Sequence, residues 1–86
     1  MGPSIYTAMP IFYFNLHDDV VAIDEEGREL ADVGVARTEA IAAARDLICE
    51  QVRGGRLNLS HRIEVEDEDR RPVLTLPFRA ALEIES

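Results

Sequence analysis

The sequence predicts an α+β fold, a two-layer sandwich in which an antiparallel four-stranded sheet carries one long helix on one face. A long amphipathic segment covers residues 32–53, and on each side of it lie two short segments with alternating apolar and polar residues. Two hairpins joined by a helix bury their apolar faces most simply when the helix packs across the sheet. The order along the chain is therefore strand, strand, helix, strand, strand, and the strand order within the sheet stays open.

The length and composition of the chain predict one domain. Of its 86 residues, 47% are hydrophobic, which favours a folded core over a disordered chain. Residues 1–8, MGPSIYTA, show no periodicity, and we expect them to form a flexible N-terminal extension. Met9 and Pro10 are consistent with a second start. The single α+β domain is accordingly expected to cover residues 9–86.

The first strand is predicted over residues 11–17, IFYFNLH. Its side chains alternate between two faces with the period of a half-buried strand. The opposite face is polar, and we expect it to meet solvent rather than a second core. That face is expected to carry Tyr13, Asn15 and His17, and from the later strands Glu64, Glu66, Val73 and Thr75.

A second strand is predicted over residues 20–24, VVAID. Asp18 and Asp19 precede it and have the side chains of turn formers. Val21 and Ile23 alternate with other residues, so we expect both to face the core. The two strands together predict a β-hairpin.

The helix is predicted over residues 32–53 because its apolar residues recur at spacings of three, four and seven. Asp32 is a suitable N-cap, since its carboxylate can accept from the free amides of the first turn. Gly54 and Gly55 follow the last turn and can adopt the left-handed conformation that ends a helix. The apolar stripe consists of Val33, Ala36, Ala40, Ile41, Ala44, Leu47, Ile48 and Val52.

The second hairpin is predicted from residues 62–67, RIEVED, and 72–78, PVLTLPF. Pro72 and Pro77 lack amide donors, so they belong at the ends of a strand or at an edge of the sheet. Residues 79–84 are compatible with a short helical turn, and the pattern does not decide this point. The long helix is expected to cover Phe12, Phe14, Val21, Ile23, Ile63, Val65, Leu74 and Leu76.

The charge of the chain limits its partners. The formal net charge is -8, whereas a nucleic-acid-binding protein usually presents a basic face to the phosphates. We therefore expect no nucleic-acid partner, while a basic protein remains compatible. The single Cys49 excludes an internal disulfide framework and favours a reducing compartment. No apolar run approaches the length of a membrane span, so we expect a cytoplasmic protein without membrane contact.

Several stretches of the chain resemble a known family: MPIFYFNLHD, DEEGREL, the alanine-rich helix and IEVEDEDRRPVLTLPF. From residue 9 to residue 78 the chain is similar to short bacterial proteins classed as a domain of unknown function. The resemblance implies an aromatic first strand after Met-Pro and a closing hairpin, and it implies no catalytic or binding residue. The chain departs from the family at Asp19, where glycine is common, and lacks glycine between Glu68 and Val73.

One group of residues is a candidate ligand-binding site: Tyr13, His17, Asp18 and Asp19. A histidine beside carboxylates has the donor types of a metal site. Neighbouring residues on a strand point to opposite faces, however, and paired aspartates are common in turns, so we predict no metal site. The acidic run of residues 64–69 lacks the ligand spacing and the glycine of a calcium loop. We also predict no catalytic residue and no cofactor.

Two functional classes follow from these observations. The favoured class is a small acidic, non-enzymatic module for protein–protein interaction or regulation, which binds another protein or associates with itself as a homodimer. Its sheet edges can accept a strand from a partner, and the C-terminal overhang of the helix is the first place where we expect a subunit contact. The alternative is a small-ligand or metal-binding protein, or an enzyme, with a site at a dimer interface near the first hairpin.

Overall fold

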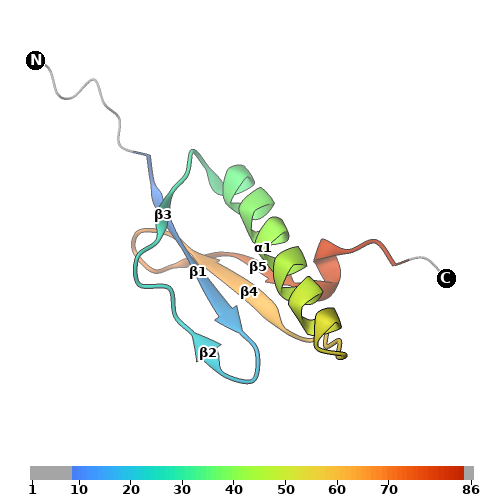
Figure 1. Ribbon diagram of the computed structural model, residues 1–86. Coiled ribbons are helices and arrows are strands. Elements are labelled where there is room, and N and C mark those ends of the chain that lie inside the picture. Colours follow the sequence, from blue (N-terminus) through green and yellow to red (C-terminus); the bar gives the residue numbers. More distant parts are fainter. Residues whose placement is uncertain (1–8, 85–86) are drawn as a thin grey trace, which may run out of the picture.

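The computed structural model describes residues 9–84, so the predicted extension of residues 1–8 lies outside the described residues. The elements are shown in Figure 1. Their arrangement confirms the α+β class. In chain order they are β1 (Ile11–His17), β2 (Val21–Ala22), β3 (Arg28–Glu29), α1 (Val33–Arg53), β4 (Arg62–Glu66), β5 (Pro72–Pro77) and the 3-10 helix η2 (Phe78–Ala81).

The strand order, which the sequence left open, is β2-β1-β4-β5. All pairs are antiparallel, and β3 also pairs with β1, at the end opposite to β2. The register places Phe14 opposite Val65 and Val65 opposite Leu74, so the apolar side chains of three strands share one face. A bulge between Val65 and Glu66 shifts the pairing with β5, and Val73 lines a hollow together with Phe12 rather than lying on the polar face as predicted.

The helix begins and ends as the sequence predicts. The carboxylate of Asp32 accepts a hydrogen bond from the backbone N–H of Val35, at 2.9 Å. At the other end, Gly55 has a φ of 81°. Its N–H donates to the carbonyl of Val52, and the N–H of Arg56 donates to the carbonyl of Gln51. This pair of bonds is the Schellman motif, which satisfies carbonyls that the last turn leaves free.

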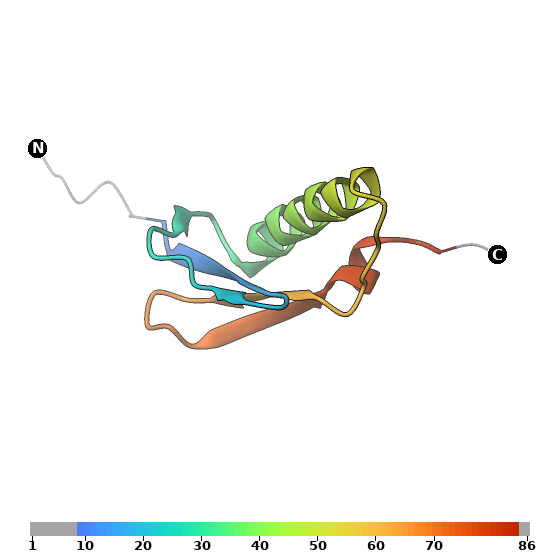
Figure 2. The ribbon, with the colours of Figure 1, turned by 60° about the horizontal axis from the view of Figure 1, so that its bottom comes forward.

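The helix lies against the sheet through a stripe of small residues. Ala36, Ala40 and Ala44 are fully buried and Ile48 is nearly so, at regular four-residue spacing. Because alanine has no side chain beyond Cβ, the helix can approach the strands closely. Figure 2 shows α1 along one face of the sheet, where it packs on β4, β5 and η2. The buried strand and 3-10 residues are Phe12, Ile63, Val65, Leu76, Phe78 and Ala81.

The prediction for the second strand is wrong in two respects. Only Val21 and Ala22 pair with β1, instead of residues 20–24. Val21 and Ile23 are 51% and 55% exposed rather than part of the core. The physical reason is their position: β2 lies at the edge of the sheet, and the helix packs over the opposite half.

Asp24 holds the loop that separates β2 from β3. Its carboxylate accepts from the backbone N–H of Phe14 in the middle of β1, at 3.0 Å, and from the N–H groups of Glu26 and Gly27, at 3.1 Å. Burial raises the pKa of Asp24, but these backbone hydrogen bonds and the charge of Arg28 lower it by more. The pKa of Asp24 therefore lies below that of an ordinary aspartate.

Arg70 links the second hairpin to this loop across the outer face of the sheet. It is the one residue other than glycine with positive φ, 65°, in the described chain, at a turn where the sequence offers no glycine. Its guanidinium lies 3.5 Å from the ring centroid of Tyr13. It also donates to the carbonyl of Asp24 at 3.0 Å and to the carboxylate of Glu66 at 3.3 Å.

Replacing Gly27 by alanine should destabilise the fold. Gly27 has a φ of 73°, and an added Cβ would lie 2.5 Å from Cγ2 of Ile11 and 3.0 Å from Cε1 of Tyr13. We expect the free energy of unfolding in urea to fall by about 1–3 kcal/mol. Gly54→Ala is the matched control, because Gly54 has negative φ and room for a methyl group. Its effect should stay within about 0.5 kcal/mol, and equal effects of both variants would contradict this account.

Replacing Asp24 by asparagine should lower stability at neutral pH by about 1–3 kcal/mol, because charge-assisted hydrogen bonds are lost. The folded-state pKa of Asp24 lies below its unfolded value, so its stabilisation is complete above the unfolded pKa. It is lost as the pH falls through the folded pKa. Urea unfolding from pH 7 into the acid range should therefore show the difference between wild type and Asp24→Asn shrinking below about pH 4. Glu25→Gln, next to it and exposed, should show no such difference.

Candidate functional site

A hollow lies where the C-terminal end of α1 meets the turn after β1. We call it the helix-end pocket. Its volume is about 440 Å³, within the range of small-molecule sites, roughly 300–1,000 Å³. Three segments far apart in the sequence form it: the β1–β2 turn, the end of α1 with the following connection, and the start of η2. Its lining residues are Leu16, Asp18, Asp19, Leu47, Glu50, Gln51, Gly54, Arg56, His61 and Phe78.

His61 is the residue of this pocket with an unusual environment. Its side chain is only 11% exposed, and Nε2 is buried without a hydrogen-bond partner among the described residues. The nearest carboxylate oxygen, Oδ1 of Asp19, lies 4.0 Å from Nε2, too far for a hydrogen bond. A buried polar atom without a partner costs about 1–3 kcal/mol, so a group that supplies one would be bound favourably.

The position of His61 is set by Phe78. The backbone N–H of Phe78 donates to the carbonyl of His61 at 2.9 Å, which continues the pairing of β4 with β5. The two rings meet edge to face, with centroids 5.6 Å apart and an interplanar angle of 74°. This arrangement holds the imidazole at the wall of the pocket.

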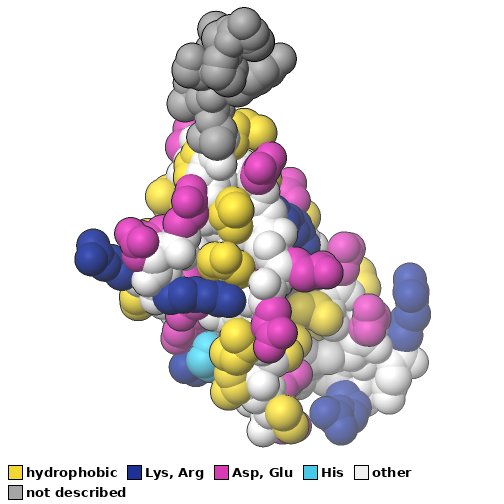
Figure 3. Space-filling view, turned by 90° about the vertical axis from the view of Figure 1, so that its left-hand side faces the viewer, with side chains coloured by type: hydrophobic (Ala, Val, Ile, Leu, Met, Phe, Trp, Pro, Cys, Tyr) yellow, Lys and Arg dark blue, Asp and Glu magenta, His cyan; other side chains and the backbone are white. Residues whose placement is uncertain are grey.

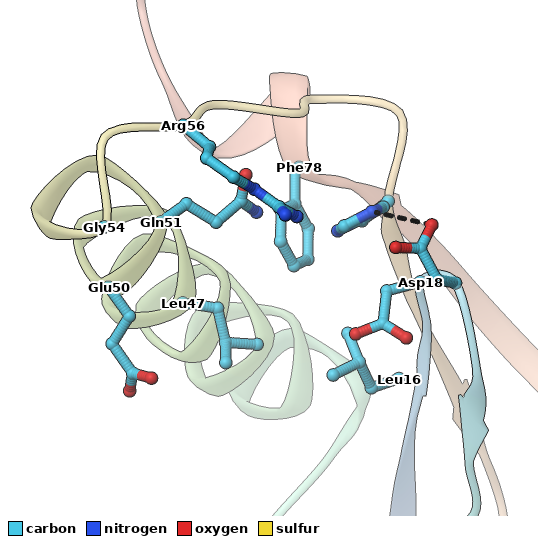
Figure 4. Close-up of a pocket in the computed structure, with 10 residues that line it drawn as sticks. Leu16, Asp18, Leu47, Glu50, Gln51, Gly54, Arg56 and Phe78 are labelled. Carbon is cyan, nitrogen blue, oxygen red and sulfur yellow. Dashed lines mark ion pairs between the residues drawn. The ribbon is translucent and has the colours of Figure 1, made fainter.

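Charged side chains of both signs border the hollow, and among those of residues 9–84 only His61 and Asp19 come within 4.0 Å of each other. The guanidinium of Arg56 forms no ion pair within 4.0 Å in residues 9–84, and the Asp18 carboxylate forms none either. Figure 4 shows the Arg56 side chain reaching over Phe78 toward the hollow, Asp18 facing it from the other side, and Glu50 pointing away. One oxygen of Asp18 accepts from the N–H of Val20, at 2.8 Å, which holds the turn.

The connection after the helix is also held in place. The side-chain amide of Gln51 bonds to both backbone groups of Asn58, accepting from its N–H and donating to its carbonyl. Asn58 in turn accepts from the N–H and the hydroxyl of Ser60. The wall of the pocket that carries His61 is thus tied to the last turn of α1.

The structure divides the four predicted site residues into two pairs. Asp18 and Asp19 line the helix-end pocket. Tyr13 and His17 lie on the outer face of β1 and do not line it. The ligand-binding role of these four residues stays a prediction, but they do not share one hollow.

Tyr13 and His17 already have partners on the outer face. The Tyr13 ring stacks under the guanidinium of Arg70. His17 lies 3.3 Å from Arg62 through Nδ1 and 3.6 Å from the carboxylate of Glu64 through Nε2. Arg62 also bonds to Glu64, at 3.0 Å, so these three side chains form one network. This network links β1 to β4 on the polar face through side-chain contacts across the two strands.

Sequence reasoning did not select His61, Arg56 or Phe78 as site residues. No local motif marks them, because they come together only when β4 and the start of η2 pass beside the helix end. The sequence feature nearest to them is the glycine pair Gly54 and Gly55, which ends α1 and therefore places Arg56 beside the strand ends. That feature gave no indication of which histidine would be buried.

Within residues 9–84, no group of three or more His, Cys, Asp or Glu residues is placed to hold a metal ion. No helix in this part of the chain is both long and apolar enough to cross a membrane.

Comparison with known proteins gives one match. Searches of the curated proteins and of the solved structures found no significant similarity. One family model matches residues 11–79, from the start of β1 to the start of η2, and it confirms the resemblance that the sequence carries. The chain therefore belongs to the family described as a domain of unknown function (DUF6894).

Proposed function

We propose that this protein is a non-enzymatic protein–protein interaction module that associates with itself through the edge of its sheet at β2. One observation carries the proposal. Four consecutive apolar residues at this edge, Val20 to Ile23, are exposed, with Val20 73% and Ile23 55% accessible. Contiguous apolar surface of this kind is typical of sites that another molecule covers.

The uncovered surface extends from the edge onto the sheet. Because α1 packs over β4, β5 and η2, the half-buried Phe14 and Leu16 of β1 remain open to a groove of about 350 Å³ that Ala22 and Ile23 also line. Figure 3 shows this side of the molecule, where hydrophobic side chains alternate with carboxylates. Arg28 closes one end of the groove, lying 4.9 Å from the ring of Phe14 and paired with Glu39 of the helix at 2.8 Å.

The edge also offers backbone groups. No described strand pairs with the outer side of β2, so its free N–H and C=O groups can accept a strand from a partner. A second copy supplies the same edge, and two such edges can pair about a two-fold axis. The apolar side chains of both copies would then cover each other.

A second candidate function is small-ligand binding near the first hairpin. The observation that favours it is the helix-end pocket, because Asp18 and Asp19 line it and directly precede the exposed edge at Val20. A partner on β2 would therefore lie next to the mouth of this pocket.

Light scattering over a concentration series tests self-association. We expect the average mass of the wild type to rise toward that of a dimer in the micromolar range. Ile23→Lys should remain monomeric, because a charged side chain would be buried at the contact. Val52→Lys is the matched control at an exposed valine of the helix end and should associate like the wild type.

The average mass measured at several salt concentrations distinguishes an apolar dimer contact from one driven by charge. Each copy carries a net charge of -8, so two copies repel, and salt screens that repulsion. The dimer should therefore become more populated as salt increases. A strict monomer at high micromolar concentration and high salt would contradict the proposal, as would a dimer that Ile23→Lys leaves intact.

A further inference from the structure

We propose that the helix-end pocket binds a small zwitterion, a molecule that carries a carboxylate and an ammonium group on a short carbon chain. The inference rests on the second candidate function and does not depend on self-association. Three features of the pocket carry it: a buried nitrogen without a partner, unpaired charges of both signs, and an apolar floor.

The carboxylate of the ligand is held by His61 and Arg56. Nε2 of His61 is buried and has no partner in residues 9–84, and with its proton on Nε2 the imidazole donates to a ligand oxygen. The guanidinium of Arg56 reaches toward the same hollow (Figure 4) and has no ion pair there in the described chain. A guanidinium binds a carboxylate through two parallel hydrogen bonds.

The ammonium of the ligand is held at the turn after β1, next to His61, because Oδ1 of Asp19 lies 4.0 Å from Nε2 of His61. Asp18 and Asp19 face the pocket from the turn after β1. An ammonium group between these carboxylates would gain charge-assisted hydrogen bonds.

A ligand with only one charge fits the pocket less well. A simple carboxylate would approach Asp18 and Asp19 without a compensating positive group, and a simple amine would approach Arg56. A zwitterion satisfies both sides at once. Its carbon chain would lie on the apolar floor formed by Leu16, Leu47 and Phe78.

Nuclear magnetic resonance titration tests the proposal with defined probes. The probes are glycine, 3-aminopropanoate, 4-aminobutanoate and 5-aminopentanoate, with alkylamines and alkylcarboxylates of the same chain lengths. We expect at least one amino acid to shift the imidazole signals of His61 to saturation, and both singly charged analogues to bind roughly tenfold or more weakly. His17 is an internal control, because it lies on the outer face, paired with Arg62 and Glu64.

Two variants test the two ends of the ligand separately. Arg56→Gln and Asp18→Asn should each weaken binding of the amino acid roughly tenfold. The Arg56→Gln variant should bind the amino acid no more tightly than it binds the alkylamine of the same chain length. Asparagine keeps the oxygen that accepts from Val20. The controls Arg37→Gln and Glu25→Gln change the net charge equally at exposed positions outside the pocket, and they should leave binding unchanged. Backbone spectra verify that each variant is folded.

Several outcomes would overturn the inference. They are the absence of a saturable shift at His61, an amine or carboxylate that binds as tightly as the best amino acid, and a control variant that weakens binding as much as the pocket variants. The titration is repeated with Ile23→Lys. Binding that this variant retains shows a site within one chain, whereas a site lost with Ile23→Lys belongs to the dimer contact and contradicts the inference.

Discussion

The packing of the alanine stripe of α1 on β4 and β5 is the contact on which the rest of this structure depends. Ala36, Ala40 and Ala44 have no exposed surface, and their small size lets the helix lie close to the sheet. Helix and sheet then share one core with Phe78 and Ala81 of η2. The same contact commits the helix to one half of the sheet. In the other half β2 is exposed and Phe14 and Leu16 of β1 are only half-buried, although Phe12 lies in the core.

The exposed edge of the sheet is kept in shape by polar contacts. The carboxylate of Asp24 accepts from the N–H of Phe14, a backbone group of β1 that a neighbouring strand would otherwise bind. The N–H of Asp24 donates to the side chain of Asn15. Asn15 is 2% exposed, so this bond satisfies a buried amide oxygen. Arg70 then ties the second hairpin to the carbonyl of Asp24. A sheet edge held by such bonds can remain ordered while its apolar side chains stay exposed.

The two surfaces proposed for binding are adjacent because one turn separates them. Asp18 and Asp19 face the helix-end pocket, and the residues directly after them form the exposed edge. The pocket depends on the position of the helix end, which the Schellman motif at Gly55 fixes. Occupation of the pocket would therefore restrain the turn that leads into β2. The first hairpin therefore contributes to both proposed surfaces, with its turn at the pocket and its second strand at the exposed edge.

The sequence by itself determined most of the elements, because their signals are local. It placed β2 with wrong bounds and did not predict β3, which consists of Arg28 and Glu29 alone. Alternation marked β1 at its observed bounds, and Asp32 and the glycine pair marked both ends of α1. The prolines were expected at strand ends or at an edge, and they are the first and last residues of the edge strand β5. The outer face was predicted to be polar, and it carries the Tyr13 and His17 contacts described above. Asn15, which was expected to meet solvent there, is instead buried, and its side chain accepts from the N–H of Asp24.

Tertiary structure alone decided the rest, because it depends on which half of the sheet the helix covers. Val21 and Ile23 have the alternation of core residues, yet they are exposed since α1 packs over the other strands. His61 resembles any loop histidine in sequence and becomes a buried group only when Phe78 and Asp19 arrive from distant segments. Local patterns report how a segment can fold, whereas burial depends on which other segments are placed beside it.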